Sequence, residues 1–248
     1  DQEEVAALFA KYDMVSAPVV DAQNRLLGRV VFDDVHDVVE IEQSEDLSLL
    51  AGTHEDELAS SSAFRTARLR LPWLVICLGG TLLSGSVLHY HSDTLKQFLI
   101  LMFFVPAVMA TAGNSGLQTA TMTVRSMALG HADRTGPAAL VLKQLRVAAM
   151  VGLACGLLAG LAGSVWSHLT PADQTGAGGA VLLGTIIGGS MCAAICVSCT
   201  MGVLVPLTFR RIGIDPAVAS GPLITTSSDI FGLIVYLGVA RSLLVQLS

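Results

Sequence analysis

Residues 215–240 read "DPAVASGPLITTSSDIFGLIVYLGVA" and place one acidic side chain, Asp229, inside an apolar stretch long enough to cross a bilayer. A carboxylate in the middle of a spanning helix costs about 2.5–3.5 kcal/mol on insertion scales, so it is expected to face a protein interior or a water-filled path. Thr225 and Thr226 precede it by about one turn on the same helical face, and Pro222 by one turn more. These neighbours favour an ion site at Asp229 over the alternative, a protonated side chain bonded to another helix.

The composition indicates a membrane protein. Of 248 residues, 52% are hydrophobic and 14% are charged, with a mean hydropathy of +0.66, whereas soluble domains carry roughly 25% charged residues. Fifteen of the twenty acidic residues lie before Ala59, and the apolar segments begin near Leu71. The chain therefore has two regions in different solvents. It begins with Asp and lacks a signal-peptide pattern, so we expect a fragment of a longer protein.

The N-terminal region has the pattern of half a small α/β unit. We expect a helix at 3–12, a strand at 17–20, the polar turn "DAQNR", a strand at 26–32, and a helix capped by Asp33 and Asp34. This assigns residues 1–50 to one domain, 51–70 to a connecting linker that turns from acidic to basic, and 71–248 to a membrane domain.

Five apolar segments follow, at 71–88, 97–124, 144–166, 179–208 and 216–240, each near the ~20 residues of a spanning helix. The second contains "GNSG" (113–116) and the fifth contains Pro216 and Pro222, so irregular backbone is expected in both, facing protein or water. Pro222 also withholds an N–H from the Val218 carbonyl, leaving that oxygen available to an ion.

The distribution of Lys and Arg predicts the orientation, because these residues collect on the cytoplasmic side. Nine flank one set of segment ends (Arg65, Arg68, Arg70, Arg125, Arg134, Lys143, Arg146, Arg210 and Arg211), and two flank the other (Lys96 and Arg241). We expect the N-terminal region in the cytoplasm and the C-terminus outside.

Uncharged polar residues accompany Asp229 at membrane depth. The second segment contributes Asn114, Gln118 and several hydroxyl groups, a set suited to a hydrated cation, although single Ser and Thr residues also hold helices together. No phosphate-binding, metalloprotease or Ser/His/Asp pattern is found, so catalysis is not predicted. The five cysteines have no His at ligand spacing, and packing is their expected role.

Ten acidic residues and no Lys or Arg lie between Asp33 and Glu57. A solvated acidic face is one interpretation, and divalent cations bridging carboxylates are the other. The regulatory metal candidates are Asp33, Asp37, Glu42, Glu45 and Asp46. In the third and fourth segments, glycines recur at intervals of four, which predicts close helix packing within one subunit or between two.

Two stretches resemble the signatures of the MgtE family of magnesium channels: "FVPAVMATAGNSGLQTATMTVRSMALG" (104–130) and "IDPAVASGPLITTSSDIFGLIVYLGVAR" (214–241). The stretch "APVVDAQNRLLGRVVFDDVHDVVE" (17–40) resembles the second half of a CBS domain. The resemblance covers essentially the whole chain. It implies an all-α membrane protein with five transmembrane helices per subunit, preceded by a partial α/β CBS domain.

The resemblance further implies a homodimer with the pore on its two-fold axis, closed by cytoplasmic domains when internal Mg2+ is high. Asp229 matches the pore aspartate that holds hydrated Mg2+, Asn114 a polar pore residue, and Asp215 the acidic residue at the cytoplasmic mouth. Gly221 and Thr225 depart from the family pattern, in which an Asn and a small apolar residue are found. Two copies of Asp229 on a two-fold axis would match the charge of a divalent ion.

The resulting hypothesis is a Mg2+ channel of the plasma (inner) membrane, in contact with lipid and Mg2+ but not nucleic acid, with ATP as a candidate ligand of a complete CBS domain. Two alternatives stay open. One is a proton-coupled transporter of divalent cations. The other is a CBS-regulated membrane sensor whose helices only dimerise.

Overall fold

The computed structural model describes residues 2–57, 62–128, 136–169, 177–219 and 221–245. It contains two compact units, Asp1–Leu69 and Arg70–Ser248, which are described separately below. Residues 58–61 of the expected linker, and Arg134, lie outside the described residues.

The first unit has the predicted order of elements. Along the chain these are α1 (Gln2–Tyr12), β1 (Ser16–Val20), β2 (Leu26–Val31), α2 (Phe32–Leu50) and a short 3-10 turn, η1 (Glu55–Glu57). The two strands pair antiparallel, with Ser16 opposite Val31, and the register shifts between Val19 and Val20. A small helix–hairpin–helix α/β unit therefore precedes the apolar helices.

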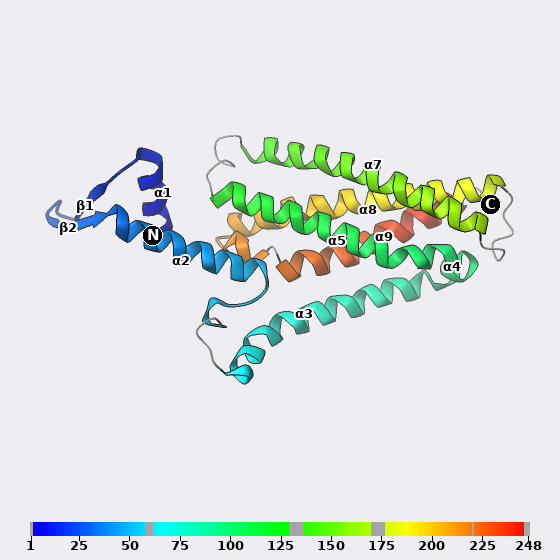
Figure 1. Ribbon diagram of the computed structural model, residues 1–248, viewed down its shortest axis with the longest axis horizontal. Coiled ribbons are helices and arrows are strands. Elements are labelled where there is room, and N and C mark those ends of the chain that lie inside the picture. Colours follow the sequence, from blue (N-terminus) through cyan, green and yellow to red (C-terminus); the bar gives the residue numbers. More distant parts are fainter. Residues whose placement is uncertain (1, 58–61, 129–135, 170–176, 220, 246–248) are drawn as a thin grey trace. The chain divides into compact units, whose positions relative to one another are not determined.

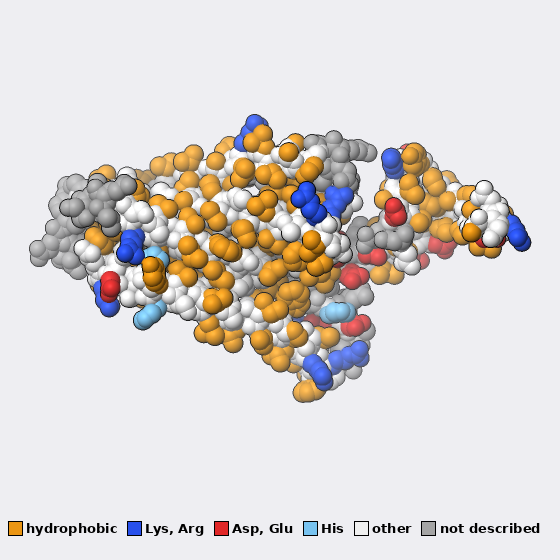
Figure 2. All heavy atoms as spheres, turned by 180° about the vertical axis from the view of Figure 1, so that it is seen from behind, with side chains coloured by type: hydrophobic (Ala, Val, Ile, Leu, Met, Phe, Trp, Pro, Cys, Tyr) orange, Lys and Arg blue, Asp and Glu red, His pale blue; other side chains and the backbone are white. Residues whose placement is uncertain are grey.

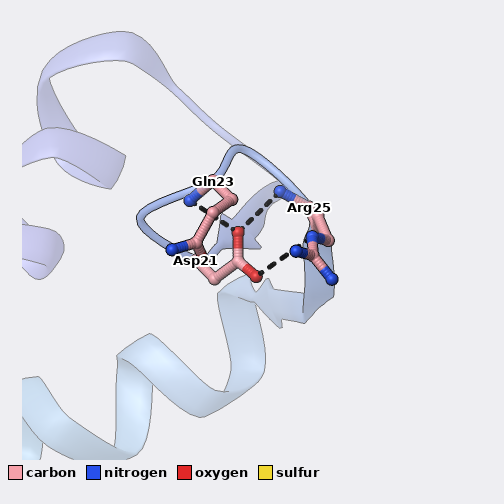
Figure 3. A network of polar contacts seen from close by, with 3 residues as sticks. All are labelled: Asp21, Gln23 and Arg25. Atoms are coloured by element: carbon pink, nitrogen blue, oxygen red, sulfur yellow. Dashed lines mark hydrogen bonds and ion pairs between the residues drawn. The ribbon is translucent and has the colours of Figure 1, made fainter.

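The hairpin turn is held by Asp21 (Figure 3). Its Oδ1 accepts hydrogen bonds from the backbone N–H groups of Gln23 (2.9 Å) and Arg25 (2.8 Å). Asn24 takes a left-handed conformation with φ 60°, which Asn tolerates better than most residues. The predicted polar turn thus has a local side-chain cause.

The start of α2 differs from the prediction. Val31 occupies the N-cap position, and both expected caps, Asp33 and Asp34, lie in the first helical turn. The Asp34 carboxylate accepts the Val31 N–H at 3.2 Å. The acid therefore stabilises the helix start from inside the first turn, where N–H groups point toward it and the helix dipole favours negative charge.

The second unit is built from long apolar helices (Figure 1). These are α3 (Ala63–Tyr90), α5 (Leu99–Ala128), α7 (Pro137–Leu169), α8 (Ala177–Arg211) and α9 (Gly221–Val245), with the short α4 (Ser92–Gln97) between the first two. All five long helices can cross a membrane by length and hydropathy, as predicted. Figure 2 shows one face covered mainly by hydrophobic side chains, with few charges.

Helix α8 is the centre of this unit. It packs against α5, α7 and α9 and is the most buried of the five long helices, whereas α3 is the most exposed. The main core therefore lies where α5, α8 and α9 meet, and includes Val108, Ile195 and Leu233.

Backbone irregularity was predicted in two segments and is found in one. The prediction is wrong for "GNSG", because α5 continues unbroken through residues 113–116. It is confirmed for the fifth segment, where the 3-10 turn η2 (Pro216–Ala219) precedes α9. Pro222 lies in the first turn of α9, where N–H groups lack an intrahelical acceptor in any case. It starts the helix and does not interrupt it.

The glycines that recur at intervals of four form a seam inside one subunit, between α7 and α8. They are Gly152, Gly156 and Gly160 of α7 and Gly184 and Gly188 of α8. A Cβ added to Gly188 would lie 2.5 Å from the Gly156 carbonyl oxygen, and one added to Gly160 would lie 2.7 Å from the Gly184 oxygen. The two backbones are therefore in direct contact, which only residues without a side chain allow.

This seam predicts a large difference between two adjacent glycines. Gly188→Ala should lower the free energy of unfolding by about 1–3 kcal/mol, because the methyl group overpacks the contact. Gly189 has nothing within 4 Å of an added Cβ, so Gly189→Ala is the matched control and should leave stability unchanged or slightly higher. Thermal unfolding of the purified protein in detergent measures both, and equal unfolding midpoints would contradict the seam.

Candidate ion-binding site

Asp229 lies on the third turn of α9 and is half-buried. Its carboxylate approaches α5 at Gly113, where an added Cβ would lie 3.6 Å from Oδ1. Helix α5 therefore presents bare backbone to this oxygen instead of a side chain. The absence of a side chain at this position leaves space beside the carboxylate that an ordinary residue would fill.

Behind Asp229, three helices pack closely at the next turn of α5. A Cβ on Gly116 would lie 2.6 Å from the Ser228 hydroxyl and 3.1 Å from the Ser198 carbonyl oxygen of α8, and one on Gly202 would overlap the Gly116 carbonyl. The Ser198 and Ser228 hydroxyls are fully buried and have no hydrogen-bond partner among the described residues. Gly116 of "GNSG" thus serves the close packing of α5 against α8 and α9, inside a helix that continues unbroken.

Asn114 lies beside Gly113 but on the exposed side of α5. Gln118, one turn further, is exposed as well, whereas Ala112, Ser115 and Thr119 are buried toward the bundle. Helix α5 therefore has a buried face against α8 and α9 and an exposed face that carries two carboxamides.

Thr225 lies one turn before Asp229 and is also half-buried. Its hydroxyl donates to the Pro222 carbonyl oxygen at 3.1 Å. Its proton is thus used within the helix, and the hydroxyl oxygen keeps the capacity to accept from water.

Asp215 is exposed and precedes η2. Its Oδ1 accepts the Ala217 N–H at 2.8 Å, and its carbonyl accepts the Val218 N–H at 3.3 Å. Asp215 therefore forms the turn that leads into α9. Its side chain is separated from Asp229 by this turn and the first two turns of the helix.

The regulatory candidates all lie on α2, in the other unit. Asp33, Asp37 and Glu45 are exposed, whereas Glu42 and Asp46 are half-buried and engaged in further interactions. Among the described residues, no three His, Cys, Asp or Glu side chains come close enough to hold a metal ion. In this part of one chain, Asp229 supplies a single carboxylate.

The half of α9 that follows Asp229 is closely packed. Leu233, Tyr236, Leu237 and Ala240 are at most 1% exposed, and the Tyr236 hydroxyl donates to the Leu101 carbonyl oxygen of α5 at 3.2 Å. The sequence analysis did not single out this link. Its signal was a Tyr in the apolar part of the segment that follows Asp229, since a buried Tyr hydroxyl usually finds a partner.

The five helices define a multi-pass membrane protein in which the Asp229 carboxylate and the Asn114 and Gln118 carboxamides lie on the apolar helices. A family model described as "Divalent cation transporter", MgtE, matches residues 105–239, which include Asn114, Asp215 and Asp229. The chain belongs to the MgtE family.

Curated relatives match almost the whole chain. A protein named Magnesium transporter MgtE from Thermus thermophilus is 37% identical over 246 residues, which is 98% of this chain and 52% of the relative. The protein of the same name from Bacillus subtilis is 34% identical over 242 residues, 98% of this chain and 51% of the relative. The chain spans about half the length of these relatives.

The exposed position of Asn114 gives a test of what it faces in the membrane. With the five native cysteines replaced, Asn114→Cys should react with a charged thiol reagent more than about tenfold faster than Leu157→Cys, because the reacting thiolate forms in water and not in lipid. Leu157 is 67% exposed on α7 and is the lipid-facing control. Equal rates for the two cysteines would mean that Asn114 faces lipid.

Proposed function

We propose that this chain is the membrane part of a homodimeric Mg2+ channel whose pore lies on the two-fold axis. The observation that carries the proposal is the half-buried carboxylate of Asp229, held beside bare backbone at Gly113, next to the exposed Asn114. The names of the relatives support Mg2+ as the ion, and they support a transport protein over an enzyme or a sensor.

The exposed polar residues of α5 argue for a second copy. Polar groups facing hydrocarbon without partners cost several kcal/mol each, and Asn114 and Gln118 are exposed in the single chain. They are satisfied if this face of α5 meets protein or water. A two-fold axis along the face gives both, because each copy covers the other and the space between them is lined by identical polar groups.

Two copies also complete the ion site. One carboxylate per chain gives two at the axis, and their charge balances that of one divalent cation. Mg2+ gives up its water reluctantly and is commonly held through one or two carboxylates and several waters. Asn114 and Thr225 are suited to bind such waters. Asp215, at the start of the turn before α9, would meet the ion at the cytoplasmic end.

The membrane potential suffices to drive uptake. A divalent ion that moves inward across 100 mV gains about 4.6 kcal/mol. We infer from the Lys and Arg distribution that the first unit lies in the cytoplasm, and we propose the plasma (inner) membrane as the location of the protein.

The first unit would be the second half of a CBS domain with a regulatory role. It exposes large apolar side chains, including Val15, Leu26 and Leu27, which the other half of such a domain would cover, and a complete domain is a candidate for ATP binding. The acidic residues of α2 would be regulatory Mg2+ sites formed together with carboxylates outside this chain.

The ion site predicts that Asp229→Asn lowers Mg2+ flux at least about tenfold, since losing both charges at the axis should cost more than about 1.4 kcal/mol of ion stabilisation. Uptake into liposomes by the purified protein measures it, with the exposed Asp93→Asn as the control. Parent-like flux of Asp229→Asn would contradict the pore assignment. Flux that requires a pH gradient would favour the proton-coupled transporter, and absence of any flux the sensor.

The acidic residues between Asp33 and Glu57 are predicted to affect the inhibition of the channel by internal Mg2+ and not its permeation. In the full-length protein, neutralising Asp33, Asp37, Glu42, Glu45 and Asp46 to Asn or Gln should leave permeation intact and shift inhibition to higher internal Mg2+. The reason is that a ligand biases the closed state only through its differential affinity for that state. Asp34 is kept, because it accepts the Val31 N–H. Patch recordings with millimolar steps of internal Mg2+ test this, and an unchanged inhibition curve would reduce the run to a solvated face.

A further inference from the structure

Helix α3 meets the rest of its unit through a narrow set of small residues. Gly80 and Ser84 are its buried residues, while Leu74, Leu78 and Leu82 are 59–66% exposed. A Cβ added to Gly80 would overlap Cγ2 of Thr226 on α9 and would lie 3.7 Å from Cδ1 of Ile230. The Thr226 methyl group therefore occupies the space that a side chain at position 80 would need.

A second contact lies one turn earlier on both helices. The Cys77 thiol donates to the Pro222 carbonyl oxygen at 3.8 Å. Residue 77 thus meets residue 222, and residue 80 meets residue 226, so the two helices run in the same direction along this contact. Cys77, Gly80 and Ser84 recur at helical spacing and form one face of α3.

The residues of α9 that contact Gly80 lie on both sides of Asp229 along the chain. Thr226 lies three residues before Asp229, and Ile230 directly follows it. On the other side, the Asp229 carboxylate approaches Gly113 of α5. The turn of α9 that carries the carboxylate is therefore seated between two glycines, one on α3 and one on α5.

We propose that Gly80 is a positioning residue for Asp229: by admitting the Thr226 methyl group, it lets α3 fix where the carboxylate-bearing turn of α9 lies. This inference rests on the proposed function for its effect on Mg2+. The contact is one of shape, since membrane helices associate through close packing and not through a hydrophobic driving force.

Four variants of the full-length protein test it by Mg2+ uptake into liposomes, with flux measured per folded dimer over a range of Mg2+ concentrations. Gly80→Ala should raise the half-saturating Mg2+ concentration by about fivefold or more, because a binding site loses function when its supporting residues shift by about 1 Å. Gly79→Ala is the matched control and should match the parent, because nothing lies within 4 Å of an added Cβ at Gly79. Gly80→Ala/Thr226→Ser, which removes the opposing methyl group, should return to the value of Thr226→Ser alone.

The rescue separates positioning from a general loss of structure. A reduced amount of folded protein would lower total flux and leave the half-saturating concentration unchanged. An unchanged concentration for folded Gly80→Ala, or a double variant that stays impaired, overturns the proposal. If Gly80→Ala does not fold, the double variant must fold and match Thr226→Ser, and its failure to do so also overturns the proposal.

A readout that does not depend on transport distinguishes this proposal from the proposed function. Absence of Mg2+ flux in the parent would contradict the channel and not the contact. In that case thermal unfolding decides: Gly80→Ala should lower the unfolding midpoint relative to Gly79→Ala, and Thr226→Ser should restore it. Equal midpoints for the two alanine variants would contradict the contact itself.

Discussion

At Gly116 the backbone of α5 lies so close to α8 and α9 that one added methyl group would collide with the Ser228 hydroxyl. Helices in lipid gain little from burying apolar surface against one another, so close backbone approach is a main source of their association. The same device recurs between α7 and α8 at Gly156 and Gly188. The position of Asp229 depends on this packing, because α9 is held by the backbones it touches more than by bonds from its side chains.

Hydropathy was enough to predict five spans, because each span must satisfy its backbone internally and must match the bilayer thickness. The small α/β unit before them was predicted from helix and strand periodicity and from its polar turn. The "GNSG" stretch was misjudged. Glycine weakens a helix in water, so local propensity suggested a break. In the bundle Gly116 permits close contact with α8 and α9, and no local window of the sequence contains these helices.

Asp229 was identified from the sequence because a charge inside an apolar segment is costly wherever the chain folds. Its surroundings were not predictable in the same way. That Gly113 faces the carboxylate, and that Thr226 fits against Gly80, depends on the rotation of α3 and α5 about their own axes. Small residues line several faces of these helices, so their spacing did not show which face packs against α9. It also did not show whether the glycine repeat joined helices of one subunit or of two.

The two halves of α9 are held differently, and Asp229 lies at the boundary between them. Beyond it, Leu233 and Tyr236 are fully buried, and a hydrogen bond ties Tyr236 to the α5 backbone. Before it, Ile224 and Ser228 are fully buried against Gly116 of α5, whereas Pro222, Thr225 and Thr226 are half-buried. This half is thus fixed by close packing on one face and is partly open on the other. Asp229 is half-buried like Thr225 and Thr226, so its helix is fixed by the packed face while its carboxylate is not fully enclosed, which suits a site that must hold an ion and also release it.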